Sequence, residues 1–290
     1  MRRFLARQAS GLVVGICGAV AVAAAISAIA EPRAHGALPY LEAAAARLGH
    51  FAQGDFGQSA ISGLPVLDEL AIRMPPTLLL VLAGAVVALL AGLPLGLLFS
   101  VGSARRAAAP LVQIVTAMPV FCAGLVLAYG AVHLLHWPVS INLPPGTPVP
   151  PDQALQIAAL PVLTVGLAGA ASVQLALRRA AAQSSGEAFR SGLKRLGLGV
   201  FEIERRFVMP QVLAGLVASA GDIMLALLSA AVVAEWVFHR PGAADLFVKS
   251  VALADWNMTA VILLVFALLA FFTEFLGRIA GFVLANEGKP

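Results

Sequence analysis

Six long apolar stretches constrain this chain more than any other feature of its sequence. They cover roughly residues 11–30, 77–102, 108–135, 154–177, 211–238 and 257–284. Each has about 20 residues or more, the length that a helix needs to cross the hydrocarbon core of a bilayer. None shows the polar and apolar alternation of a membrane β-strand. The sequence therefore predicts an all-α polytopic membrane protein, with about six transmembrane helices in a single domain over residues 1–290.

The composition supports the membrane assignment. Apolar residues make up 60% of the chain and charged residues only 12%, whereas a soluble domain carries about 25% charged residues. This excludes an ordinary cytosolic enzyme and a DNA-binding domain. Cys17 and Cys122 both lie inside apolar stretches, so we expect neither a disulfide scaffold nor a metal site.

The basic residues predict the orientation. If the N-terminus is cytoplasmic, 14 of the 19 lysine and arginine residues lie on the cytoplasmic side, as the positive-inside rule requires. An even number of spans then returns the C-terminus to the cytoplasm. An alternative for the first stretch is a signal peptide cleaved after Ala28-Ile29-Ala30, which would leave five spans; the length of the stretch favours a retained helix.

Two connecting segments stand out. Residues 31–76 form a predicted external segment, and residues 178–210 form the longest cytoplasmic one. Gly192, Gly197 and Gly199 punctuate the cytoplasmic segment, which predicts a helix, a tight glycine turn, a short amphipathic helix and then the next span. The segment is either a topological anchor or a docking element for a cytoplasmic partner. Its length favours docking, because two arginines suffice in the loop at 105–106.

Catalytic motifs are missing from the sequence. It has no phosphate-binding P-loop and no H-E-x-x-H metalloprotease helix, so we expect no catalytic residue and no metal ligand. Three carboxylates, Asp222, Glu235 and Glu274, lie within apolar stretches, where burying a charge costs at least about 2.5–3.5 kcal/mol. Each should face the bundle interior, a cavity or a partner. Simpler roles are a hydrogen bond to a neighbouring helix for Asp222, a helix cap or a salt bridge for Glu235, and a pair of Glu274 with Arg278.

The cytoplasmic segment resembles a known motif. The spacing from Gly197 to Pro210 is similar to that of the EAA loop in permeases of ABC importers, and the run Arg190 to Leu198 resembles the dipeptide/oligopeptide/nickel group of that family. Further segments resemble the same group in the same order: Gly54-Asp55-Phe56-Gly57-Gln58-Ser59, Met74-Pro75-Pro76-Thr77-Leu78, Met118-Pro119-Val120-Phe121, Leu160-Pro161-Val162-Leu163-Thr164 and Glu235-Trp236-Val237-Phe238-His239-Arg240-Pro241-Gly242. The ordered set is more specific than any single motif.

This resemblance implies the permease fold of a type I ABC importer in a bacterial inner membrane, with both termini in the cytoplasm. The chain would be a transport subunit and not an enzyme. Implied partners are a second homologous permease, usually in a heterodimer, two cytoplasmic ATPases and an extracytoplasmic substrate-binding protein. ATP and Mg²⁺ would bind to the ATPases and no cofactor to this chain. The family's substrates include peptides, nickel chelates, sugars and opines, and the sequence leaves the choice open.

The resemblance also assigns roles to residues. Contact with the ATPases would involve the coupling segment, with Glu187, Gly197, Phe201, Glu202, Ile203, Glu204, Arg205, Arg206, Phe207 and Pro210. The translocation path would include Pro119, Pro161, Asp222, Met224, Ser229 and Glu235, the two prolines kinking their spans.

Two other classes of function remain open at this point. An ion-coupled secondary transporter would use Asp222 or Glu274, and it predicts inverted repeats, of which the sequence gives no sign. A non-transporting membrane scaffold predicts that a change at Gly197 leaves transport intact.

Overall fold

The computed structural model describes residues 2–30, 37–100, 118–137, 151–184 and 187–287, which are almost entirely helical. The helices are α1 (Arg2–Ala28), α2 (Ala37–Ala52), α3 (Val66–Ser100), α5 (Val120–Leu134), α6 (Pro151–Ser184), α7 (Glu187–Arg195), α8 (Val200–Ile203), the π-helix η1 (Glu204–Val208), α9 (Met209–Ala218), α10 (Ala220–Val237), α11 (Ala243–Ala252) and α12 (Trp256–Glu287). Within the described ranges there is no strand beyond an isolated bridge between Gln58 and Pro65.

The predicted helical membrane bundle is confirmed. Five of the described helices, α1, α3, α6, α10 and α12, are long and apolar enough to cross a membrane, and α5 is a shorter apolar helix. The predicted span at 108–135 begins in residues 101–117, outside the described part of the chain, and α5 is its described portion.

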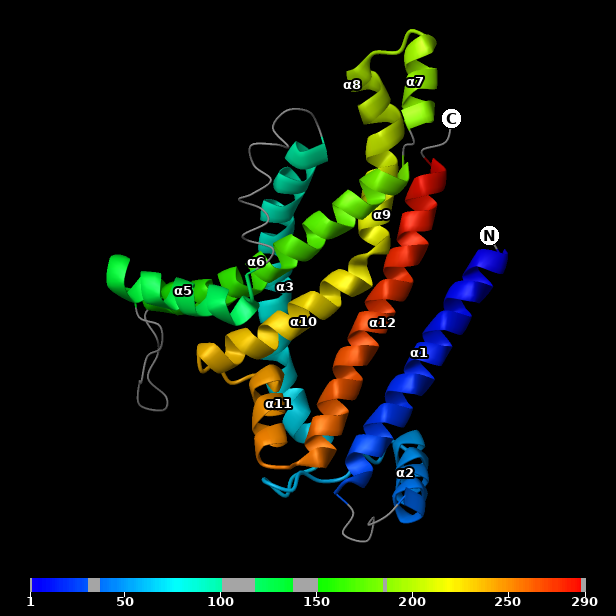
Figure 1. Cartoon of the computed structure of the whole chain (residues 1–290). Coiled ribbons are helices and arrows are strands. Elements are labelled where there is room, and N and C mark those ends of the chain that lie inside the picture. The colour runs from blue at the N-terminus through cyan, green and yellow to red at the C-terminus, as the bar shows by residue number, and fades with distance from the viewer. Residues whose placement is uncertain (1, 31–36, 101–117, 138–150, 185–186, 288–290) are drawn as a thin grey trace.

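Small residues bring α3 and α6 close together where the two helices cross (Figure 1). Gly84 faces Val165, and Gly166 faces Val87, so each glycine receives the branched side chain of the opposite helix. A Cβ atom at either glycine would clash with that valine. Lipid gives helices no hydrophobic reason to associate, so this close packing is a main source of their affinity. The pair α3 and α6 forms the rigid centre of the bundle.

Helix α3 starts earlier than the sequence predicts. A span from about residue 77 was expected, but one helix runs from Val66 through Pro75 and Pro76. The two prolines remove two amide donors. They lie near the exposed residues that precede them, such as Ile72, so the freed carbonyl groups are close to the surface. The apolar length that follows keeps the helix continuous.

The predicted fifth span is two helices. α9 ends at Ala218 and α10 begins at Ala220, with Ser219 between them. The Ser219 hydroxyl donates to the Gly215 carbonyl at 3.0 Å, an interaction that often bends helices. Because of the break, Asp222 lies in the first turn of α10 rather than in mid-span.

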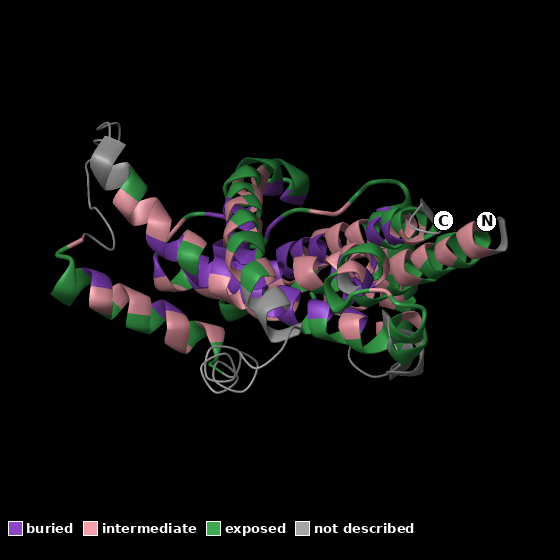
Figure 2. Ribbon diagram, turned by 90° about the horizontal axis from the view of Figure 1, so that it is seen from above, coloured by how far each residue is buried: buried purple, intermediate pink, exposed green. Residues whose placement is uncertain are grey.

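Different helices and chain termini lie at the two ends of the bundle (Figure 1). The start of α1, the end of α12 and the α7–α8 segment lie at one end, which we call the α7 end. Helices α2 and α11 lie at the opposite end, the α11 end. Burial is concentrated where α3, α6, α10 and α12 meet, whereas α5 and the first half of α6 extend away from that centre (Figure 2).

Candidate functional site

The glycine turn of the coupling segment has a defined geometry. Gly197 has a φ angle of +85°, a left-handed conformation that a side chain disfavours. Its amide donates to the Lys194 carbonyl at 3.0 Å, and the Leu198 amide donates to the Leu193 carbonyl at 3.3 Å. These are the two hydrogen bonds of a Schellman motif. The turn ends α7 and directs the chain into α8, in agreement with the local structure expected from the sequence.

The short helix after this turn leads without a break into the next apolar helix of the bundle. α8 passes through η1 directly into α9, and Pro210 occupies the first turn of α9. One face of the segment is apolar and uncovered: Leu196 is 78% exposed, Val200 58% and Phe201 78%. The opposite side is anchored, because Ile203 and Val208 are buried in the core of the chain. The expected role of Ile203 as a contact for the ATPase is therefore wrong, since its side chain is only 1% exposed.

The polar residues of the segment lie around this apolar face. Arg206 and Glu202 form an ion pair at 3.1 Å, one helical turn apart. Arg205 is exposed, and Phe207 and Pro210 are half-buried. Glu187 is the first residue of α7, and Glu204 is the first residue of η1. The structure thus brings Phe201, Glu202 and the two arginines onto one accessible segment.

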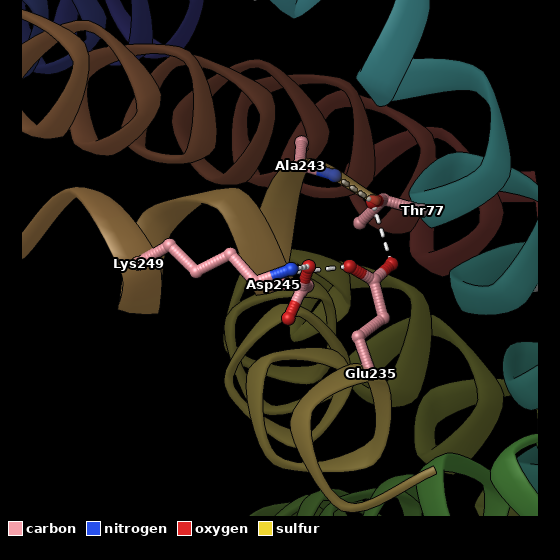
Figure 3. A network of polar contacts seen from close by, with 5 residues as sticks. All are labelled: Thr77, Glu235, Ala243, Asp245 and Lys249. Atoms are coloured by element: carbon pink, nitrogen blue, oxygen red, sulfur yellow. Dashed lines mark hydrogen bonds and ion pairs between the residues drawn. The ribbon is translucent and has the colours of Figure 1, made fainter. Parts of the chain in front are cut away.

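Glu235 has a different environment from the one expected for a path residue. Its side chain is 1% exposed. It accepts a hydrogen bond from the Thr77 hydroxyl at 2.6 Å and one from the Asp245 amide at 2.9 Å (Figure 3). Thr77 in turn accepts from the Ala243 amide at 2.8 Å. Glu235 and Thr77 therefore satisfy the free amides at the start of α11, and the alternative of a helix cap describes Glu235 correctly.

The sequence Glu235 to Gly242 explains this cap. Gly242 precedes α11, and a Cβ atom there would collide with the Glu235 carboxylate. The Arg240 amide donates to the Glu235 carbonyl at 2.9 Å, and Phe238 is buried. Glycine is thus required where the carboxylate meets the helix end. Asp245, in the first turn of α11, pairs with Lys249 at 2.5 Å (Figure 3).

A second polar cluster fastens the external segment to α12. The Ser59 hydroxyl donates to Asp255 at 2.5 Å, and Asp255 also accepts from the Met258 amide at 3.1 Å in the first turn of α12. Asn257 donates to the Gln58 carbonyl at 3.1 Å and accepts from Ser27 at 2.6 Å. Residues 54–59 are thereby held between the end of α1 and the start of α12.

The other predicted path residues lie on several different elements. Pro119 directly precedes α5, and Pro161 lies buried inside α6. Asp222 faces Arg179 at 3.8 Å. On α10, Met224 is half-buried and Ser229 is exposed. The hydroxyl of Ser229 bonds to its own helix at Leu225.

Comparison with known proteins decides the family. Residues 62–281 match the family described as "Binding-protein-dependent transport system inner membrane component". The chain belongs to this family. The permease is also similar to the glutathione transport system permease protein GsiC of Escherichia coli strain K12, with 27% identity over 219 residues, 74% of this chain and 69% of the relative. GsiC of Salmonella typhi is 28% identical over 222 residues, 76% of this chain and 70% of that protein.

This membership makes the chain a permease component of a binding-protein-dependent ABC importer in the inner membrane. It also implies ATPase and substrate-binding protein partners. Sequence reasoning predicted the glycine turn and the short helix after it, but it missed the contacts of Thr77 with Glu235 and of Ser59 with Asp255. All but Asp255 lie in the motifs that carried the resemblance, and nothing in a single sequence shows that such segments meet.

Proposed function

We propose that this permease converts movement of cytoplasmic ATPases into alternating access through the coupling segment 190–210. The observation that supports this most is the continuity of α8, η1 and α9. An exposed docking surface and the apolar helix α9, which packs in the bundle against α6 and α12, are parts of one rod. A displacement of α8 would tilt α9 as a rigid element, a common form of switching in proteins.

The surface of the coupling segment supports protein docking. Leu196, Val200 and Phe201 form an uncovered apolar face, and the Glu202–Arg206 pair stands beside it. An aromatic anchor surrounded by polar residues is typical of a helix that binds in a groove. The ATPases would bind ATP and Mg²⁺, and this chain would bind neither.

Sidedness and assembly are also part of the proposal. The ends of α1 and α12 share the α7 end with the coupling segment (Figure 1). If the ATPases bind there, both termini are cytoplasmic, as the distribution of basic residues predicts. The α11 end would then receive the substrate-binding protein. A second homologous permease, in a heterodimer, would complete the path.

Peptides or related small solutes are the proposed substrates. The relatives named above are glutathione permeases, and glutathione is itself a short peptide. An ion-coupled mechanism has less support, because both of its candidate carboxylates have cationic partners. Asp222 faces Arg179, and Glu274 pairs with Arg278.

The test is co-purification. A tagged chain is purified in mild detergent from its native membrane, and the proteins that follow it are identified by mass spectrometry. We expect two ATPases and a second permease to co-purify with the wild-type chain. With Phe201→Ser, the second permease should remain and the ATPases should be lost. Phe272→Ser, a change at a 57% exposed phenylalanine of α12, should retain all partners. A chain that purifies and crosslinks alone would refute the proposal.

A further inference from the structure

One face of α6 carries polar side chains inside a candidate membrane span. The span covers Leu155–Gln183. A hollow of about 370 Å³ lies against it and is lined by Ala171, Ser172, Gln174, Leu175 and Arg178. We call these five residues the α6 polar face. Polar side chains within a span nearly always face a partner or a water-filled cavity and not lipid.

A second, larger hollow lies beside the first one. It has a volume of about 450 Å³, lies between α5 and α6, and is lined by apolar residues such as Val126 and Leu127 of α5 and Leu167 of α6. Ala171 and Ser172 border both spaces. Both spaces lie along α6, whose first half separates from the bundle together with α5 (Figure 2). Along α6 toward α7, the lining therefore changes from apolar to polar and then to basic.

Gln174 is the residue of this face that lacks a partner. Its side chain is 3% exposed, and its Nε2 atom has no hydrogen-bond partner in the described part of the chain. A buried donor left unpaired costs about 1–3 kcal/mol, and lipid tails offer no acceptor. The same side chain lines the hollow, which is open space that can admit an acceptor.

The remaining faces of α6 are occupied by this chain. Val173 packs against Gly92 of α3, and Ala180 packs against Gly215 of α9. Arg179 faces Asp222 of α10 at 3.8 Å. The α6 polar face is thus the side of the helix that lies against the hollow and not against α3 or α9.

We propose that the α6 polar face lines the solute path and that Gln174 donates a hydrogen bond to a carbonyl or carboxylate oxygen of the passing solute. This rests on the importer function proposed above. Arg178, one turn beyond Gln174, also lines the hollow. The recognised class is a small acyl-containing solute, such as a peptide with a free carboxylate.

Cysteine labelling tests the proposal without knowledge of the substrate. Gln174→Cys is placed in the full transporter in membrane vesicles, with Cys17 and Cys122 replaced by alanine. The probe is the anionic reagent sulfonatoethyl methanethiosulfonate, applied without nucleotide and with ATP plus vanadate. We expect labelling at least tenfold faster in one of the two conditions. Val173→Cys, buried against α3 at the same depth, should stay unlabelled in both.

Other outcomes would overturn the inference. If position 174 reacts with membrane-permeant N-ethylmaleimide but not with the anionic reagent, the α6 polar face contacts lipid. No reaction in either condition, with a crosslink to the second permease, would make it a subunit contact. The importer function has its own control, because the ATPases must co-purify with the Gln174→Cys chain. If they do and position 174 is unreactive, only the present inference fails.

Discussion

The hydroxyl of Thr77 joins three helices. It extends from α3, donates to Glu235 of α10 and accepts from the Ala243 amide of α11. The residue is fully buried, so water cannot replace either bond. Hydrogen bonds to a charged group contribute about 1.5–3 kcal/mol each, which makes this one hydroxyl a strong local constraint.

We predict that Thr77→Val lowers the melting temperature of the detergent-purified permease by roughly 5 °C, as expected for a loss of about 2 kcal/mol. The substitution conserves shape but removes both bonds. Thr273→Val is the matched control, because the Thr273 hydroxyl bonds only to Leu269 of its own helix. Thermal unfolding followed by size-exclusion chromatography measures both variants. Equal shifts would show that the Thr77 contacts are not stabilising.

Gly197 controls the direction of the chain through its backbone. No heavy atom lies within 4 Å of a Cβ built there, and its φ is +85°. We predict that Gly197→Ala strains the turn by about 1–2 kcal/mol and weakens ATPase binding roughly tenfold. Gly197→Asn should recover part of the loss, since asparagine tolerates this conformation.

Gly199→Ala is the control for this experiment, because Gly199 has equal space around it and no left-handed φ. Titration of the purified permease with its ATPases gives the affinities. The same affinity for the Gly197 and Gly199 variants would exclude a role for the turn geometry.

At the scale of elements, helix types were easier to predict than helix boundaries. The glycine turn after α7 follows from one residue, because glycine alone adopts its φ without strain. The passage of α3 through Pro75 and Pro76 was not predictable from local rules, since apolar packing outweighs two lost amide donors. The break at Ser219 depends on a side chain that bonds to Gly215, which periodicity does not reveal.

The external segment gives a prediction at this scale. Ser59 accepts from the Ile61 and Ser62 amides, each at 3.2 Å, and donates to Asp255 of the α12 start. We predict that Ser59→Ala releases the segment and speeds hydrogen exchange of those two amides about tenfold, equivalent to about 1.4 kcal/mol. Ser10→Ala, which removes only a local bond to Arg7, should leave their exchange unchanged. Unchanged exchange in Ser59→Ala would mean that the segment is held elsewhere.

At the scale of the whole molecule, the sequence predicted which helices form but not which distant residues come into contact. The helical bundle and the coupling turn follow from apolar length and from glycine. The contact of Thr77 with Glu235 joins residues 158 positions apart, and that of Ser59 with Asp255 joins residues 196 apart. Such pairs arise from packing of the complete chain. They explain why Glu235, which was expected to line the path because it is polar, instead caps the start of α11. Gln174, by contrast, lines a hollow.

The central claim is that the α8–η1–α9 rod transmits movement of the ATPases into the membrane. The most direct test measures the distance between spin labels at Leu213→Cys on α9 and Leu79→Cys on α3, both exposed positions, in the assembled importer. We predict that the distance changes between the nucleotide-free and ATP–vanadate conditions. It should stop changing when Val208→Gly and Met209→Gly interrupt the rod at the junction of η1 and α9 with the ATPases still bound. An unchanged distance in the intact importer, or a full change after the interruption, would contradict the account.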